Sequence, residues 1–582
     1  MTTMQTEKLL QEFPPVSTES WEEAIRADLE GADYGKKLIW QSPEGLAVKS
    51  YYRAEDTAEL QAGDRSSLAA SGARCIGDWR IREEIEAEDP AEARVAAQRA
   101  VAAGAEEISF LNMVLDDEPD VRMLFAGLPA IPLHLENASQ SLIPLLLECS
   151  GTCRERSTIS TGRSPLEDLA FAASVLQSAP AAFIPFMVDG GTIGECGGTA
   201  LEEIGYPIAA GIEFLREMQE RGIEIGRAAG SIAFSFSIGA SFFFQVGKLR
   251  AFRWLWARVI ESFGGDREKV KARIYARTSR WNQTIYDPHV NIVRSTTEAM
   301  SAVMGGADSI CVAPFDGCYK VADDASRRLA RNTQLILKHE GMLARVADPG
   351  AGSYCLEMIT DFLAREGWKL MQRIEAAGGY TKACSEGLLN DALREGAALR
   401  ERAVTSRRLV LTGTNQYANP AERALDRVEP LHASDLRRGA EVYEHLRLRT
   451  ERHAANAGKM PRFMMAEFGD KKMRAARSHF AANLFACSGF DIVSQRFTTA
   501  NEIAESDADV IVLCSSDPEY LGMAGEVTKQ LKAMGRETPV IVAGNPDSVE
   551  RLRAAGVADF IHAHSNPIEV LTAWQQRLGV KP

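Results

Sequence analysis

The stretch from Ala181 to Gly264 decides the fold class. AAFIPFMVDG (181–190) and SIAFSFSIG (231–239) are mainly apolar runs. They precede the amphipathic segments ALEEIGYPIAAGIEFLREMQERG (200–222) and ASFFFQVGKLRAFRWLWARVIESFG (240–264). Strands without polar alternation are typical of parallel sheets covered on both faces. Because parallel strands need a long crossover, usually a helix, this stretch predicts two consecutive βα units.

The same pattern extends in both directions along the chain. Further apolar runs are EEISFLN (106–112), IPLHLE (131–136), RIYARTS (273–279) and DSICVAPFD (308–316). Six or more βα units over residues 66–405 favour a (β/α)8 barrel of the TIM type. A dinucleotide-binding sheet would also carry GxGxxG after its first strand, and these runs have none.

Residues 460–582 form a second α/β pattern with shorter repeats. We expect a flavodoxin-like, doubly wound domain whose ligand crevice lies outside the carboxyl ends of its strands. The five predicted strands are PRFMMAEF (461–468), FDIVSQ (490–495), ADVIVLCSS (508–516), TPVIVAG (538–544) and ADFIHA (558–563).

Two further segments flank the barrel. Residues 1–65 predict an extended arm with a short helix from Trp21 to Leu29 and a strand-turn-strand at KLIWQSPEGLAVKSYY (37–52), and such arms usually pack on another body. Residues 406–459 predict a helical linker. Seven arginines balance seven acids between Glu422 and Arg452, which favours a solvated helix along another domain over a basic nucleic-acid face.

Composition restricts the location and the class of partner. The 582 residues carry 66 basic and 80 acidic side chains, a net charge of −14, so nucleic acid is a poor candidate partner. Neither a signal peptide nor a run of about 20 apolar residues is present, and we expect no membrane contact. Ten scattered cysteines without a CxxC predict reduced thiols in the cytoplasm.

Two short motifs could suggest a metal site. Cys149 and Cys153 form C-x3-C, and His562 and His564 form H-x-H after the last predicted strand. Neither pair has neighbouring ligands that would complete a tetrahedral site, so we expect no metal.

Two other features suggest a pocket. His134, inside a predicted strand, is either a pocket residue or a hydrogen-bonded core histidine. The glycine-rich loop 189–199 follows a strand and precedes a helix, where its N–H groups could meet an anion or form a tight turn. It lacks the GK[ST] of a phosphate-binding loop.

Three segments carry a resemblance to a known family. They are TSRWNQTIYDPHVNIVRSTTEAMSAVMGGADSI (278–310), SPEGLAVKSYY (42–52) and RRLARNTQLILKHEGMLARVADPGAGSYCLE (327–357), the last with ARNTQ followed by DPxxGSY. The chain resembles the adenosylcobalamin-dependent acyl-CoA mutases, above all the methylmalonyl-CoA mutase family. The resemblance implies a CoA-threaded barrel followed by a flavodoxin-like cobalamin domain.

At the cofactor positions of that family the sequence departs from the pattern. The family's D-x-H-x-x-G motif supplies a cobalt-binding histidine and an aspartate that orients it. By alignment Lys472 stands at the aspartate, Arg474 at the histidine and Phe468 at a nearby lysine. A guanidinium cannot ligate cobalt. His479 has no aspartate two residues before it, and the family's later glycine-rich turns read Ala543-Gly544 and His562-Ala563-His564-Ser565.

The barrel departs in the same direction. The family's corrin-facing tyrosine falls at Glu84, its loop glutamine at Gly194, its substrate-carboxylate arginine at Ser231 and its thioester-binding histidine at Tyr275. Serine cannot replace a bidentate arginine. The resemblance therefore implies that no catalytic or cofactor-binding residue remains in this chain.

Together these departures predict the small, non-catalytic subunit of a heterodimeric methylmalonyl-CoA mutase. Its large partner would hold adenosylcobalamin and the acyl-CoA substrate and interconvert methylmalonyl-CoA and succinyl-CoA, while this chain has a structural or regulatory role. Two alternatives stay open: an active mutase for another acyl-CoA, and a CoA-ester-binding or cofactor-loading partner protein.

Overall fold

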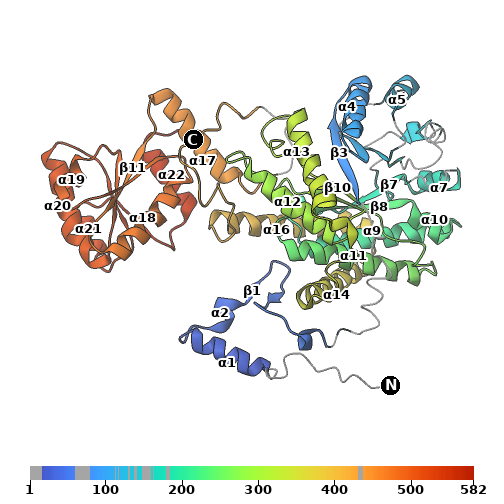
Figure 1. Cartoon of the computed structure of the whole chain (residues 1–582), viewed down its shortest axis with the longest axis horizontal. Helices are drawn as coiled ribbons and strands as arrows, with labels where there is room; N and C mark the ends of the chain where they lie inside the picture. The colour runs from blue at the N-terminus through green and yellow to red at the C-terminus, as the bar shows by residue number, and fades with distance from the viewer. Residues whose placement is uncertain are drawn as a thin grey trace, which may run out of the picture.

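The chain comprises an arm, a large helix-covered sheet and a smaller α/β unit, arranged in chain order (Figure 1). This computed structural model describes residues 16–581 except 59, 61–78, 112, 114, 116, 129–130, 137–139, 144, 147, 149–158, 161–162, 179–183 and 430–436.

The larger sheet has eight parallel strands in the order β6-β5-β4-β3-β10-β9-β8-β7. It curls, because β3 pairs with β10 and an isolated parallel bridge joins Arg163, just beyond β6, to Phe186 in β7. All six strands named from the sequence are confirmed, whereas β3 and β6 were not predicted. The strands are β3 (Arg80–Glu86), β4 (Glu107–Leu111), β5 (Leu133–Leu135), β6 (Ile159–Ser160), β7 (Phe186–Asp189), β8 (Ile232–Ile238), β9 (Ile274–Thr278) and β10 (Ser309–Cys311).

Helices cover the convex face of this sheet, and aromatic side chains fill the layer between them. Phe234 of β8 packs edge-on against Phe252 and Trp256, with ring centres 4.7 and 4.8 Å apart. Gly211 allows the close approach, since a Cβ there would lie 2.5 Å from Trp256. The helices are α4 (Pro90–Ala102), α5 (Glu118–Phe125), α7 (Leu169–Ser178), α8 (Gly191–Glu195), α9 (Ala200–Glu220), α10 (Ile225–Gly230), α11 (Phe242–Ser262), α12 (Val290–Met304), α13 (Asp324–Leu335), α14 (Tyr354–Ala376), α15 (Tyr380–Ser385) and α16 (Leu388–Thr405).

The smaller unit is a five-stranded, wholly parallel sheet in the order β12-β11-β13-β14-β15. Apolar cores lie on both of its faces, as expected of a doubly wound sheet. All five predicted strands are confirmed. The elements are β11 (Arg462–Glu467), α18 (Lys471–Ala486), β12 (Asp491–Arg496), α19 (Ala500–Glu505), β13 (Val510–Cys514), α20 (Tyr520–Ala533), β14 (Val540–Ala543), α21 (Val549–Ala554), β15 (Asp559–Ile561) and α22 (Pro567–Arg577).

The connection between the sheets is not the solvated helix that the charge balance predicted. The α-helix in the described part of this connection is α17 (Glu441–Ala457). Its residue Arg447 is fully buried. Its guanidinium lies 3.6 Å from the centre of the Tyr286 ring and donates to the carbonyl of Asn419 at 2.8 Å. The Tyr286 hydroxyl donates to Glu451 at 2.7 Å. The helix does lie along another part of the chain, as predicted, but it is not solvated, because its charges pair inside the protein rather than with water.

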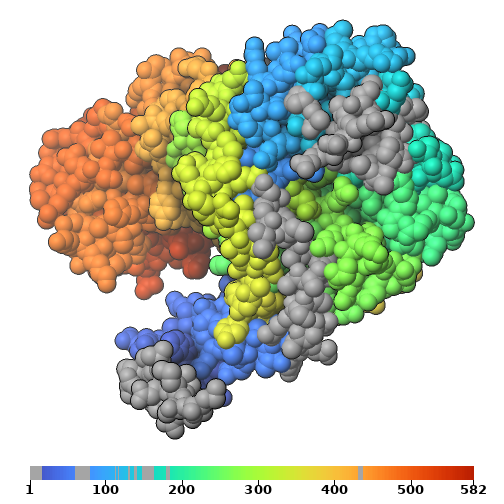
Figure 2. All heavy atoms as spheres, turned by 45° about the vertical axis from the view of Figure 1, so that its right-hand side comes forward, coloured from blue at the N-terminus to red at the C-terminus, as the bar shows by residue number. Residues whose placement is uncertain are grey.

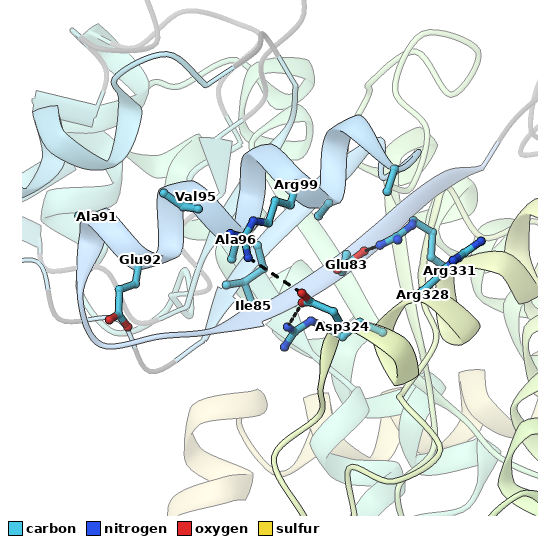
Figure 3. A pocket seen from close by; sticks show the side chains of 13 residues that line it. Glu83, Ile85, Ala91, Glu92, Val95, Ala96, Arg99, Asp324, Arg328 and Arg331 are labelled. Atoms are coloured by element: carbon cyan, nitrogen blue, oxygen red, sulfur yellow. Dashed lines mark hydrogen bonds and ion pairs between the residues drawn. The ribbon is translucent and has the colours of Figure 1, made fainter.

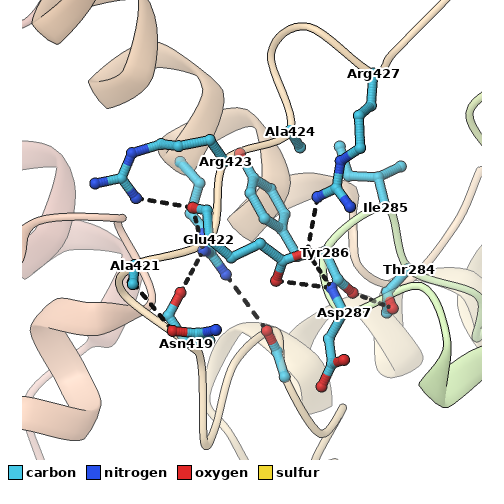
Figure 4. Close-up of polar contacts among 12 residues, drawn as sticks. Thr284, Ile285, Tyr286, Asp287, Asn419, Ala421, Glu422, Arg423, Ala424 and Arg427 are labelled. Atoms are coloured by element: carbon cyan, nitrogen blue, oxygen red, sulfur yellow. Dashed lines mark hydrogen bonds and ion pairs between the residues drawn. The ribbon is translucent and has the colours of Figure 1, made fainter.

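A neighbouring carboxylate completes this junction. Glu422 accepts the backbone N–H of Asp287 at 2.8 Å and the Arg427 guanidinium at 2.7 Å (Figure 4). Asp287 has a left-handed φ of 48°, so the bond to Glu422 holds its backbone in an uncommon conformation. The α17 segment is therefore bound to the larger sheet through hydrogen bonds to its loop at 284–287.

The described part of the N-terminal arm, dark blue at the bottom of Figure 2, lies at one side of the molecule, and its Trp40 packs edge-on against Phe244 of α11 with ring centres 5.6 Å apart. It contains α1 (Thr18–Asp28), α2 (Tyr34–Leu38) and the antiparallel pair β1 (Trp40–Gln41) and β2 (Ala47–Val48), in agreement with the predicted helix and hairpin. Neither helix has a buried residue, and Trp21 and Trp40 are each half exposed. The arm therefore presents large apolar side chains to its surroundings.

Within the described part of the chain, helices long and apolar enough to cross a bilayer are absent.

Candidate functional site

Charged side chains from three strands meet on the concave face of the larger sheet. Arg82 of β3 donates from Nε to Glu107 of β4 at 2.9 Å, and both side chains are almost fully buried. The Arg82 guanidinium also lies 4.3 Å from the centre of the Tyr275 ring in β9. Burial raises the pKa of Tyr275 to about 12, so its hydroxyl stays neutral. The position assigned to the family's thioester-binding histidine thus packs against an arginine.

Glu84 belongs to a second ion pair on the same face. Its carboxylate lies 2.7 Å from Arg277 Nη2 and 3.8 Å from Arg280 Nη2. Burial alone would lower the pKa of Arg277, but the charge of Glu84 raises it, so the guanidinium stays charged. The position assigned to the family's corrin-facing tyrosine is therefore occupied by a carboxylate that is neutralised within the chain.

His134 lies farther inside, next to Ser109 in the register of β4 and β5. Burial, followed by the charge of Arg82, holds its pKa well below the usual value, which keeps the imidazole neutral. Its Nδ1 has no hydrogen-bond partner among the described residues. His134 is therefore a buried side chain, but its Nδ1 does not form the hydrogen bond expected of a core histidine.

The glycine-rich loop is fixed by groups of this chain. Asp189 accepts the N–H groups of Gly191 at 2.9 Å and Thr192 at 3.2 Å. These donors could have met an external anion, but an internal carboxylate satisfies them. Of the two predicted alternatives, an anion-binding loop and a tight turn, the structure therefore favours the tight turn.

Gly194 in that loop has no room for a side chain. A Cβ there would lie 2.7 Å from the carboxyl carbon of Glu203. Glu203 is held in place by Lys248 Nζ at 2.8 Å, and both are buried. Burial raises the pKa of Glu203 to about 7 and lowers that of Lys248. A glutamine at position 194 would collide with this pair.

Ser231 is a structural cap. It ends α10, is 1% exposed, and donates from Oγ to the carbonyl of Ala228 at 2.6 Å. The structure places it at the start of β8, with its hydroxyl used within its own turn.

The three cofactor-position residues lie at the carboxyl edge of the smaller sheet but face different surroundings. Phe468 is buried and packs edge-on against Tyr520, with ring centres 6.2 Å apart. Lys472 is exposed in the first turn of α18. Arg474 is 9% exposed and donates from Nη1 to the carbonyl of Gly469 at 2.8 Å. A guanidinium has no lone pair for a metal, so this trio does not fit a cobalt ligand set.

Glu519, which the sequence did not suggest as a site residue, lies at the carboxyl edge of β11 and β13 and lines a pocket there with Phe468 and Arg474. It accepts hydrogen bonds from Asp470 N at 3.1 Å and from Ser516 Oγ at 2.7 Å, and a further one from the Ser515 hydroxyl. These bonds lower its pKa to about 2. Gly469 (φ 63°) faces it, and a Cβ there would lie 2.3 Å from the carboxylate.

Arg477 lies at the carboxyl end of β14. Arg477 donates to the carbonyl of Ala543 at 2.6 Å and pairs with Asp517 at 2.9 Å. A Cβ at Gly544 would lie 2.0 Å from Arg477 Nη1. The turn that is glycine-rich in the family is thus closed by an arginine of this chain.

The motifs considered as metal ligands are separate from these sites. His562 accepts the backbone N–H of His564 at Nδ1, and both imidazoles remain at the surface loop after β15. Cys149 and Cys153 lie outside the described residues. Among the described ones, no group of three or more histidine, cysteine, aspartate or glutamate side chains could hold a metal ion.

Comparison with known proteins relates this geometry to a family. A family model described as methylmalonyl-CoA mutase matches residues 167–481, more than half of the chain. The methylmalonyl-CoA mutase small subunit of Porphyromonas gingivalis is 34% identical over 625 aligned residues, covering 99% of this chain and 99% of that protein. The chain belongs to the methylmalonyl-CoA mutase family. The resemblance predicted from ARNTQ and the DPxxGSY loop is confirmed.

The chain is similar to both small and large subunits of methylmalonyl-CoA mutases. The small subunit from Streptomyces virginiae is 31% identical over 98% of each chain. The large subunit from the same organism is 25% identical over 93% of this chain and 94% of its own length. Methylmalonyl-CoA mutases are isomerases, so the chain belongs to a family with that reaction class.

Proposed function

We propose that this chain is the small subunit of a heterodimeric methylmalonyl-CoA mutase, with a structural or regulatory role. The observation that carries the proposal is the 34% identity to a small subunit over 99% of both chains. In this proposal the related large subunit holds adenosylcobalamin and the acyl-CoA and interconverts methylmalonyl-CoA and succinyl-CoA.

We propose that the chain itself binds no corrinoid. Support comes from Arg474 and Arg477, whose guanidinium groups donate to backbone carbonyls at the sheet edge, and from Glu519, whose carboxylate is held there by hydrogen bonds from this chain. The residues at this edge do not fit adenosylcobalamin, because they offer no lone-pair nitrogen at the assigned cobalt position. No step of the isomerisation is therefore assigned to this domain.

We further propose that no catalytic residue remains in the barrel. The ion pair Arg277–Glu84 supports this, since it puts a paired charge at the position assigned to the family's corrin-facing tyrosine. Arg82 supports it as well, because it pairs with Glu107 and packs against Tyr275, at the position assigned to the thioester-binding histidine. Buried, paired charges hold their own geometry and leave few free donors for a substrate.

The finer architecture is also a proposal. We interpret the larger sheet as a closed (β/α)8 barrel over residues 66–405, because the Arg163–Phe186 bridge connects its two end strands. We interpret residues 460–582 as flavodoxin-like, residues 406–459 as the linker and residues 1–65 as the arm. Unpaired cysteines among the described residues support a cytoplasmic location.

The arm supplies a surface for the partner. Its two helices bury nothing, and Trp21 and Trp40 are each 50% exposed. Obligate interfaces bury roughly 2,000–5,000 Å2 and are rich in aromatic side chains. The arm would add to such an interface by folding over the large subunit.

The proposal is tested by expressing the chain with a large subunit and without it. We expect a stable one-to-one complex with mutase activity from co-expression. The chain alone, reconstituted with adenosylcobalamin, should stay colourless and inactive. Deletion of residues 1–38 should weaken the complex, whereas Arg394→Gln on the exposed side of α16 should not.

Two results would overturn the proposal. A monodisperse monomer that ignores the large subunit would exclude the subunit role. A bound corrinoid spectrum in the chain alone would instead favour an active mutase, and binding of an acyl-CoA without corrinoid would favour a CoA-ester-binding protein.

A further inference from the structure

A pocket of about 620 Å3 lies on the outer side of the larger sheet, between α4 and α13 and over β3 (Figure 3). It lies on the opposite side of β3 from the concave face, and no described residue of the smaller sheet lines it. Its volume is within the range of small-molecule sites, about 300–1,000 Å3. One wall is the face of α4 from Ala91 to Ala103, which is about 18 Å long at 1.5 Å per residue.

The α4 side of this pocket is apolar. Ile85 forms its floor and is 4% exposed, whereas Val95 is 40% exposed at the rim. Ala96 and Ala100 lie between them on the same helix face, where their small side chains keep the space open. Val95, beside Ala96 and Ala100, therefore leaves apolar surface in contact with water, and a bound apolar group would cover that surface.

The α13 side is cationic. Arg327, Arg328 and Arg331 project from one face of α13, and Arg99 approaches from α4. Arg327 pairs with Asp324 at 2.6 Å and Arg331 pairs with Glu83. Arg328 has no ion-pair partner among the described residues. The buried Arg331, 8% exposed, has an Nε without a hydrogen-bond partner in the same part of the chain.

We propose that this pocket binds a small amphipathic anion, a carboxylate or phosphate monoester with a short apolar chain. The anionic group binds at Arg328, whose guanidinium fork matches carboxylate and phosphate oxygens. It also accepts from the unpartnered Nε of Arg331, while Nη1 of Arg331 stays paired with Glu83. The apolar chain lies along Ile85, Val95 and Ala96. Four arginines against three acids make the pocket a locally cationic place on a protein of net charge −14, which favours an anion there.

The probes are sodium octanoate and octyl phosphate, titrated into the full-length chain by calorimetry. Acetate supplies the head group alone and 1-octanol the chain alone. We expect saturable binding of at least one eight-carbon anion, with both controls at least tenfold weaker. Arg328→Gln should weaken binding about tenfold, and Ala96→Leu, which fills the apolar side, should abolish it.

Arg394→Gln on α16 is the matched control, because Arg394 is also exposed on a helix, and it should leave binding unchanged. Thermal unfolding of each variant shows that it is folded. Failure of both anions to saturate, or equal affinity in Ala96→Leu and the wild-type chain, would overturn the proposal. Protection of α4 from hydrogen exchange by a large subunit, without anion binding, would assign the pocket to a protein partner instead.

Discussion

Arg277 of β9 and Glu84 of β3 pair across the intervening strand β10, with Arg277 Nη2 2.7 Å from Glu84 Oε2. The two side chains are 33% and 15% exposed, so solvent screens the pair only in part. Removing one partner leaves the other charge in a poorly hydrated interior, which costs more than the pair itself contributes.

The first prediction concerns this pair. Glu84→Gln should lower the free energy of unfolding by about 2 kcal/mol, less than for a fully buried pair because both groups retain some water. The double substitution Glu84→Gln with Arg277→Gln should cost less than the sum of the single ones. Urea unfolding measures all three, with the exposed Glu395→Gln as control. Additive costs would mean that the two charges do not interact.

The second prediction concerns the close contact between Gly469 and Glu519. Gly469→Ala should destabilise the chain by about 1–3 kcal/mol, since a Cβ there meets the carboxylate at 2.3 Å. Gly458→Ala is the matched control: Gly458 has φ 76°, close to the 63° of Gly469, but nothing within 4 Å of its Cβ. It should cost only the left-handed strain, about 1 kcal/mol. Equal melting temperatures for the two variants would contradict the contact.

The sequence predicted the strands of the larger sheet that read as apolar runs and missed two others, the two-residue β6 and the charged β3. β3 reads RIREEIE, in which Arg82 and Glu84 face the interior while Ile81 and Ile85 pack outward. Charged residues at alternate positions are typical of a solvent-facing strand, so its burial could not be read locally. Tertiary pairing with Glu107 and Arg277 makes that burial possible.

The same limit applies to the site residues. Alignment with the family gave Glu84, Gly194 and Arg474 as replaced positions, because those comparisons need only sequence order. Glu519 and Lys248 were missed, since the partners that define them are distant in the chain: Lys248 meets Glu203, and Glu519 meets Asp470. A single glutamate after a strand, such as Glu519, does not indicate from the sequence alone that it will contact a residue as distant as Asp470.

The third prediction is a pH dependence. The pKa of Glu519 is lowered from 4.5 to about 2 by its hydrogen bonds. A depressed carboxyl pKa gives stability that is present above the unfolded value of 4.5 and is lost as the pH falls toward 2. Glu519→Gln should therefore cost about 1–2 kcal/mol at pH 7, after allowance for solvent screening, and much less at pH 2. Unfolding measured at both pH values tests this, and a difference independent of pH would contradict it.

The fourth prediction concerns the junction of the two sheets. Arg447 is fully buried, stacks on Tyr286 and donates to the carbonyl of Asn419. Arg447→Met keeps a side chain of similar length but removes the donors to the carbonyls of Asn419 and of the buried Gly413, at a cost of about 2 kcal/mol. Because Arg447 connects α17 to both the 284–287 loop and the 419–422 segment, the loss should loosen the junction before it unfolds either sheet.

Hydrogen exchange distinguishes that local effect from global destabilisation. In Arg447→Met, amides of residues 284–287 and 419–427 should exchange at least tenfold faster, while those of β8 and β13 stay protected. Arg452→Met, on the exposed side of the same helix, should change neither set, because surface substitutions usually cost under about 0.5 kcal/mol. Equal acceleration in the strands and the junction would show that Arg447 stabilises the whole chain rather than the contact between its two sheets.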